Sequence, residues 1–268
     1  METNITVGKY KFRITDNTML YDGQIYARNL KIGGEHTECV HISIKYVANK
    51  PVSAYILYDP DCSLETPLDR GTGSIVMIQT ILKYVRDEFP EIDYVQFDDM
   101  SSIDCGDTTR PRHVPLYFFS LAFNGLTWYE KYFNARLLTN HSTYRDKVSV
   151  VFQSPKPPFV DFLRIANPPL EIIDDLKPHY NNTNTYADFF SSITKENRCK
   201  YVRDWISTFM KFHFANEFSN SNWMIPIREK TLGGKTRKKR KRSYYFPKNK
   251  ILNHNRYIYN DVGAVYDM

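Results

Sequence analysis

The segment of this chain with the clearest potential for ligand chemistry is a glycine-rich turn in front of an apolar repeat. Five residues form the turn, namely Arg70, Gly71, Thr72, Gly73 and Ser74. Apolar residues then recur at helical spacing over residues 75–89. Because such a turn exposes backbone N–H groups beside the positive end of a helix dipole, it predicts a phosphate or pyrophosphate site. It is neither a Walker A loop nor a complete dinucleotide fingerprint, and the alternative is a tight turn in which Ser74 caps the helix.

Two side chains farther along the chain could accept a proton. Asp99 follows a strand predicted over residues 94–97, next to Asp98, and His113 lies just before a second predicted helix. Since adjacent strand residues point to opposite faces, at most one of the two aspartates can face a given cleft. Asp99 and His113 are therefore candidate general bases for removing a proton from an amine. The alternatives are a capped, solvated strand exit for Asp99 and an ordinary loop position for His113.

The turn and a later aromatic segment resemble two motifs of the GNAT family of N-acetyltransferases. Arg70 and Gly73 match the acetyl-CoA motif Arg/Gln-x-x-Gly-x-Gly/Ala, with Ile75 in place of the last small residue. The segment Trp128-Tyr129-Glu130-Lys131-Tyr132 resembles the aromatic-Tyr-x-x-x-Gly-Phe motif, with Phe133-Asn134 in place of Gly-Phe. The resemblance covers roughly residues 39–138, about half of the chain.

This resemblance implies a fold, a cofactor and a catalytic acid. It implies that acetyl-CoA places its pyrophosphate on residues 70–74 and that Tyr129 protonates the leaving CoA thiolate. In a chain with 20 tyrosines, packing in the core is the alternative for Tyr129. The family's two helices that follow the first strand and shape the acceptor site have no room before Gln24, so no particular acceptor is implied.

Two functions are compatible with these residues. The first is an acyl-CoA-dependent N-acyltransferase that moves an acetyl group to an amine. The second is a catalytically silent member of the same fold, acting as a structural or nucleic-acid-associated protein. The order of elements favours the first function, whereas Ile75 and Phe133-Asn134 favour the second. The Asn-, Lys- and Tyr-rich composition is similar to that of proteins of large DNA viruses of protists, a setting that suits the second function.

The elements that must position these residues predict an α/β fold, with a GNAT-like mixed sheet flanked by helices. With 268 residues, 42% hydrophobic and 25% charged, the chain has the composition of a globular protein with a sizeable core. We predict strands over residues 7–14, 24–32, 40–47, 52–58, 94–97 and 147–152, with a hairpin connection at 48–51. The helical predictions are residues 74–89 and residues 115–132, the second kinked near 124–125.

The chain divides into three predicted parts. Residues 1–153 form the α/β core, and residues 154–218 form a proline-rich connector followed by a helical extension. The helical pattern of that extension places Tyr201, Trp205, Phe209 and Phe212 on one face. Residues 219–268 form a basic, partly flexible C-terminal tail.

The basic residues of the chain are concentrated in this tail. Residues 228–250 hold 11 Lys and Arg against one Glu, so of the net charge of +6 they contribute +10 and the remainder −4. The densest run contains Lys235, Arg237, Lys238, Lys239, Arg240, Lys241 and Arg242. Such a run predicts binding to nucleic acid or to a nuclear import receptor, and the alternative is a solvated tail.

Four scattered cysteines, namely Cys39, Cys62, Cys105 and Cys199, show neither the spacing of a zinc site nor that of a disulfide framework. We therefore expect free thiols in a reducing, intracellular compartment, with the nucleus or a virion as more specific locations, and no metal. The N-terminal residues lack a secretion signal, and the apolar stretches are too short to predict a membrane span.

Overall fold

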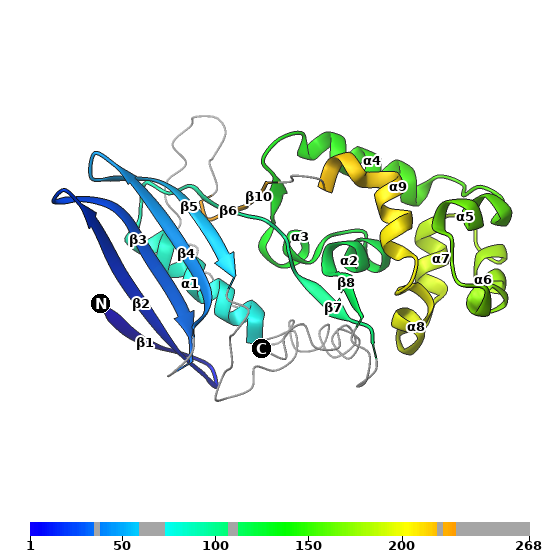
Figure 1. Cartoon of the computed structure of the whole chain (residues 1–268), viewed down its shortest axis with the longest axis horizontal. Coiled ribbons are helices and arrows are strands. Elements are labelled where there is room, and N and C mark those ends of the chain that lie inside the picture. The colour runs from blue at the N-terminus through cyan, green and yellow to red at the C-terminus, as the bar shows by residue number, and fades with distance from the viewer. Residues whose placement is uncertain (35–37, 59–72, 107–111, 219–221, 229–268) are drawn as a thin grey trace, which may run out of the picture.

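The structure of the protein, a computed structural model, describes residues 1–34, 38–58, 73–106, 112–218 and 222–228. A β-meander with one helix forms one end of the molecule and a group of helices forms the other (Figure 1). This confirms an α/β fold with a mixed sheet flanked by helices.

The first five strands form an antiparallel meander, in which each strand pairs with the next. They are β1 (Glu2–Val7), β2 (Tyr10–Tyr21), β3 (Gln24–Gly33), β4 (Glu38–Val47) and β5 (Lys50–Tyr58). The β4–β5 hairpin turns at Ala48 and Asn49, which both have positive φ, the geometry of a two-residue turn that matches strand twist. The strands predicted over residues 24–32, 40–47 and 52–58 and the hairpin at 48–51 are therefore confirmed. The strand predicted over residues 7–14 is wrong in its bounds, because the turn at Gly8 and Lys9 divides these residues between β1 and β2.

Helix α1 (Gly73–Glu88) connects β5 to the parallel strand β6 (Tyr94–Phe97) and covers one face of the meander (Figure 1). Its buried side includes Ile78, Ile81 and Val85, which recur at helical spacing. The helix therefore docks on the sheet through an apolar stripe, as the sequence predicts for residues 74–89.

After β6 the chain forms a small hairpin, two short helices and a second edge strand. These elements are β7 (Ser102–Asp104), β8 (His113–Pro115), α2 (Leu116–Asn124), α3 (Trp128–Phe133) and β9 (Arg136–Leu137). Gly125, with positive φ, ends α2, so the kink predicted near residues 124–125 is a real break between two helices.

The helical part of the chain lies between β9 and the last strand of the sheet. It consists of α4 (His141–Gln153), α5 (Phe159–Ala166), α6 (Leu170–Asn181), α7 (Tyr186–Ser192), η1 (Lys195–Asn197), α8 (Arg198–Val202) and α9 (Ile206–Phe218). Strand β10 (Trp223–Pro226) then pairs antiparallel with both β6 and β9, which gives the sheet order β1-β2-β3-β4-β5-β6-β10-β9. Residues 223–226, which the sequence analysis includes in the tail, therefore form an inner strand of the sheet.

The prediction of a strand over residues 147–152 is wrong, because these residues form the second half of α4. The β-branched Val148, Val150 and Val151 suggest a strand locally. However, Tyr144, Val148 and Phe152 are the buried residues of α4, and their four-residue spacing is that of a helix face.

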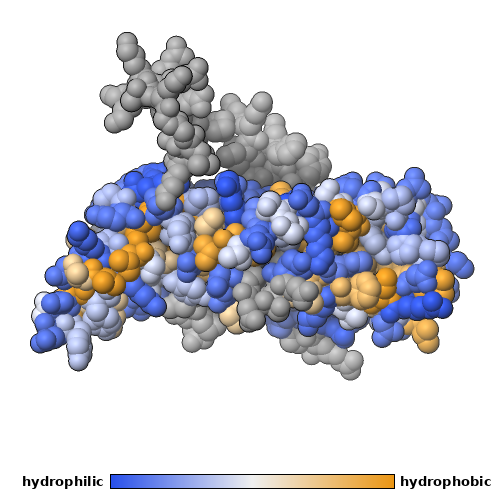
Figure 2. Space-filling model, turned by 90° about the horizontal axis from the view of Figure 1, so that it is seen from above, coloured by the Kyte–Doolittle hydropathy of each residue, from blue (hydrophilic) through white to orange (hydrophobic). Residues whose placement is uncertain are grey.

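The chain's large aromatic content forms much of its interior. In the helical part, the rings of Phe162, Trp205 and Phe209 are fully buried and in contact. Phe212 differs from its predicted face, because it is 64% exposed. Figure 2 shows a face of the molecule on which hydrophilic residues predominate between separate apolar patches.

The expectation of free thiols is wrong, because Cys105 and Cys199 form a disulfide and Cys39 is disulfide-bonded as well. Cys105 and Cys199 are 94 residues apart in sequence, and packing of α8 beside the end of β7 brings their Cα atoms to 5.0 Å. Only the tertiary fold creates this proximity, so no local spacing pattern could have predicted it.

Among the described residues, no helix combines the length and apolar character needed to cross a membrane.

Candidate active site at the end of strand β6

Strands β5 and β6 pair over two residue pairs only. Their parallel ladder consists of Ala54 with Val95 and Tyr55 with Gln96. Beyond this point β5 continues to Tyr58 in register with β4, whereas Phe97 of β6 pairs with Trp223 of β10. The ladder between the two parallel strands therefore ends near their carboxyl ends, the place where open α/β sheets usually bind ligands.

The predicted cofactor turn is described only at its last two residues. Gly73 and Ser74 are the first two residues of α1, while Arg70, Gly71 and Thr72 lie outside the described residues. Ile75, the residue that departs from the family motif, is buried in the hydrophobic core. Its bulk is thus accommodated by the core, and the first amides of α1 follow directly on the glycine-rich turn.

Asp98 and Asp99 extend from the end of β6 with different partners. The Tyr55 hydroxyl donates to Asp98 at 2.5 Å, which links β5 to the residue that follows β6. Asp99 accepts a hydrogen bond from the backbone N–H of Ser101 at 3.1 Å and another from the Ser101 hydroxyl.

The surroundings of Asp99 change its acidity. Burial raises the pKa of the carboxyl group to about 6, and the hydrogen bonds from Ser101 oppose that shift. Tyr117, in the first turn of α2, has its own pKa raised by burial and by the nearby Asp99 charge. A carboxyl group with a pKa near 6 is ionised at pH 7 and can still accept a proton, which suits a general base.

Tyr129 lies on the same strand end. It is the second residue of α3, and its ring packs on that of Phe97, the last residue of β6, with centroids 4.4 Å apart. Trp128 packs edge-on against it at 4.9 Å. The Tyr129 side chain is half-buried. Its ring therefore packs on neighbouring aromatic rings while part of the side chain stays accessible to solvent.

The structure places Asp99 and Tyr129 at the end of β6 but not His113. His113 is exposed and begins β8, where it pairs with Asp104. The other end of this hairpin is tied to the strand exit, because the Leu116 N–H donates to the Ser101 carbonyl at 2.9 Å. The length of β8 therefore separates His113 from the Asp99 region.

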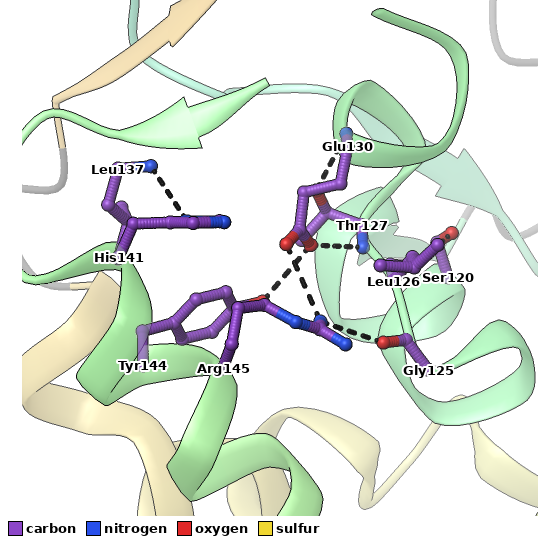
Figure 3. Close-up of polar contacts among 9 residues, drawn as sticks. All are labelled: Ser120, Gly125, Leu126, Thr127, Glu130, Leu137, His141, Tyr144 and Arg145. Atoms are coloured by element: carbon purple, nitrogen blue, oxygen red, sulfur yellow. Dashed lines mark hydrogen bonds and ion pairs between the residues drawn. The ribbon is translucent and has the colours of Figure 1, made fainter. Parts of the chain in front are cut away.

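A buried polar cluster surrounds Glu130, the residue after Tyr129, and it is not among the sites predicted from the sequence (Figure 3). The Glu130 carboxylate accepts from the Thr127 N–H at 2.7 Å and from the Tyr144 hydroxyl at 3.2 Å. Arg145 lies 3.4 Å from the same carboxylate and also donates to the Gly125 carbonyl at 2.9 Å. The spacing Thr127-x-x-Glu130 is the signature of a capping box and could have revealed half of this cluster.

His141 lies at the edge of this cluster and accepts from the Leu137 N–H at 3.2 Å through Nδ1 (Figure 3). Burial lowers the pKa of His141 and raises the pKa of Tyr144 well above its usual value. At neutral pH both groups are therefore uncharged, and the cluster is held by the Glu130 and Arg145 charges.

The remaining predicted binding residues, 235–242, lie outside the described residues. The described part of the chain contains no group of three or more His, Cys, Asp or Glu side chains arranged to hold a metal ion. When the chain is compared with protein-family models, with curated proteins and with solved structures, none of them matches it.

Proposed function

We propose that this protein is an acyl-CoA-dependent N-acyltransferase with a GNAT-like core, which transfers an acetyl group from acetyl-CoA to an amine. The observation that carries the proposal is the short parallel ladder of β5 and β6, which ends after two residue pairs. In the family that the motifs resemble, acyl-CoA enters a V-shaped opening between two parallel strands joined by a helix. Here β5, α1 and β6 supply that order, and the glycine-rich turn stands directly before α1.

In this proposal the backbone amides of residues 70–74 hold the pyrophosphate, and the thioester lies at the end of β6. Asp99 removes a proton from the attacking ammonium or amine, directly or through a water molecule. The amine nitrogen then bonds to the thioester carbonyl carbon, and the carbon–sulfur bond breaks. Tyr129 gives its proton to the departing thiolate, so that an amide and free CoA are formed.

The charges and positions at the strand end support these roles. Asp99 has a pKa of about 6, so most of it is ionised at pH 7 and ready to accept a proton. Tyr129 approaches the same strand end from α3, through its contact with Phe97. The acid and the base thus come from separate elements, α3 and the segment that follows β6.

A catalytically silent protein with the same fold is the second candidate. The run of basic residues at 235–242 favours it, together with Phe133 in place of the motif glycine. In that case the tail carries the function by binding nucleic acid, with an affinity that falls as salt rises. The acyl-CoA site would then be empty of ligand under all conditions.

A thermal shift with acetyl-CoA separates the two candidates. At a hundredfold excess over its dissociation constant, acetyl-CoA should stabilise the fold by about 2.7 kcal/mol. Gly73→Asp should abolish the shift, because it adds bulk and negative charge where the pyrophosphate belongs. Gly8→Asp, in the turn after the edge strand β1, is the control. Its positive φ makes the substitution strained, so the baseline Tm should fall while the shift with acetyl-CoA remains. A wild-type protein that shows no shift at millimolar acetyl-CoA contradicts the enzyme proposal.

A further inference from the structure

Glu130 is a buried carboxylate that the proposed reaction does not use. Its side chain is 4% exposed. Among the acidic residues that the structure describes, Asp16 is equally inaccessible, whereas Asp99 is half-buried. An ionised carboxylate is costly to bury unless hydrogen bonds and an opposite charge compensate it. The contacts of Glu130 therefore show which groups compensate its buried charge.

Those contacts come from the start of α3, the end of α2 and the first turns of α4 (Figure 3). Within α3, Thr127 and Glu130 form a reciprocal capping box, in which each backbone N–H is bound by the other side chain. From α4, the Tyr144 hydroxyl donates to the carboxylate and Arg145 pairs with it. Arg145 also binds the Gly125 carbonyl, so the same guanidinium holds the residue that ends α2.

This arrangement fixes the turn that carries Tyr129. The capping box spans from Thr127 to Glu130, and Tyr129 lies inside it. The Glu130 carboxylate is also bound by side chains of a second helix, α4. The first turn of α3 therefore cannot rotate without breaking buried, charge-assisted hydrogen bonds. The turn that directs the Tyr129 side chain toward Phe97 is thus held by the next residue in the helix, Glu130.

We propose that Glu130 is a positioning residue, whose carboxylate, held by Tyr144 and Arg145 of α4, sets the first turn of α3 and so aligns the Tyr129 phenol with the end of β6. This inference rests on the proposed function, because it assigns Glu130 an effect on the acid of that reaction. It assigns no proton transfer to Glu130. Its effect on turnover passes through Tyr129.

A second ion pair on α4 provides a matched control. Lys147 pairs with Glu217 of α9 at 2.7 Å, so Glu217→Gln removes an acidic partner of α4 without touching α3. Glu130→Gln makes the same chemical change on the other side of α4. Tyr144→Phe is a milder variant, which removes one hydroxyl donor to Glu130 and keeps the volume of the ring.

The experiment is a double-mutant cycle on the full chain, with acetyl-CoA and a lysine-containing peptide as substrates. We expect Glu130→Gln to lower kcat about tenfold or more with KM for acetyl-CoA within about twofold, and Tyr144→Phe to act in the same direction. Glu217→Gln should leave kcat within about twofold of wild type. In the Tyr129→Phe background, Glu130→Gln should have no further effect, because its influence passes through the phenol.

Two results would overturn the inference while leaving the proposed function intact. One is a loss in Glu130→Gln that persists in the Tyr129→Phe background, and the other is an equal loss in Glu217→Gln. Amide hydrogen exchange over residues 127–133 tests the same point without turnover. Exchange should become about tenfold faster in Glu130→Gln or in Tyr144→Phe and stay unchanged in Glu217→Gln. Unchanged exchange in the first two variants rejects the positioning role, whereas a wild type that neither binds nor uses acetyl-CoA rejects the proposed function.

Discussion

Replacing Asp99 by asparagine tests the burial of this carboxyl group with very little change in shape. Burial raises the pKa of Asp99 from its usual 3.8 to about 6, so the folded protein binds this proton more tightly than the unfolded chain does. Stability then falls as pH rises through this window, because the unfolded state binds fewer protons. The contribution of Asp99 is most favourable below about pH 4 and is lost by about pH 6.

The size of the effect follows from that shift. A pKa shift of about two units corresponds to about 3 kcal/mol of unfolding free energy. The side chain is half-buried, so solvent screening makes this value an upper limit, and we expect about 1 to 3 kcal/mol. Since the asparagine amide cannot ionise, the variant avoids the cost of the buried charge. Asp99→Asn should therefore gain about 1 to 3 kcal/mol relative to wild type between pH 4 and pH 7.

Urea unfolding of wild type and Asp99→Asn at pH 4, 5, 6 and 7 measures this difference. Ser101→Ala provides a check in the opposite direction, because the Ser101 hydroxyl lowers the pKa of Asp99. Its removal should move the window to higher pH. A stability difference between wild type and Asp99→Asn that is independent of pH would refute the reasoning, because it would mean that Asp99 titrates alike in the folded and unfolded states.

Three further predictions concern the core, the disulfide and the tail. Phe162→Ala should cost about 3 to 5 kcal/mol in urea unfolding, because Phe162 is fully buried among the rings of the helical part; a cost below about 1 kcal/mol would contradict that packing. Cys105→Ser/Cys199→Ser should cost about 4.7 kcal/mol, as the chain-entropy relation gives for 94 residues, and equal stability of oxidised wild type and this variant would contradict the cross-link. Deletion of residues 233–242 should leave Tm nearly unchanged and remove most salt-dependent affinity for DNA or RNA, whereas equal affinity of the truncated protein would place nucleic-acid binding elsewhere.

The sequence predicts β3 to β5 and α1 well because local signals agree with the tertiary structure there. It misses the first hairpin, since residues 7–14 are predicted as one strand. Alternating apolar residues define the strands, and the Ala48-Asn49 turn closes a hairpin between two of them. The four-residue spacing of Ile78, Leu82 and the following apolar residues matches the buried side of α1. In each case one short pattern decides both the type of element and its buried face.

The errors occur where distant parts of the chain decide the outcome. Residues 147–152 contain enough β-branched side chains to suggest a strand, but the apolar face of α4 packs on α7 and the helix prevails. Trp223–Pro226 is too short to be distinguished from a tail, and it becomes a strand because β6 and β9 flank it. The Cys105–Cys199 disulfide likewise depends on a contact across 94 residues.

The candidate site shows the same division between local and tertiary information. Local residue types identify Asp99 and Tyr129 as groups that could move protons. The raised pKa of Asp99 and the contact of Tyr129 with Phe97 depend on how α2 and α3 pack on the end of β6. Glu130 belongs to a local capping box, but its partners Tyr144 and Arg145 come from another helix.

The central claim is that β5 and β6 diverge to admit acyl-CoA, and a crystal structure of the full chain with acetyl-CoA tests it most directly. The account predicts the pantetheine arm between the two strands beyond the Tyr55–Gln96 pair, with the pyrophosphate on the amides at the start of α1 and the sulfur near Tyr129. Crystals grown at saturating acetyl-CoA that leave this opening without ligand, or that hold acetyl-CoA elsewhere on the protein, would contradict it.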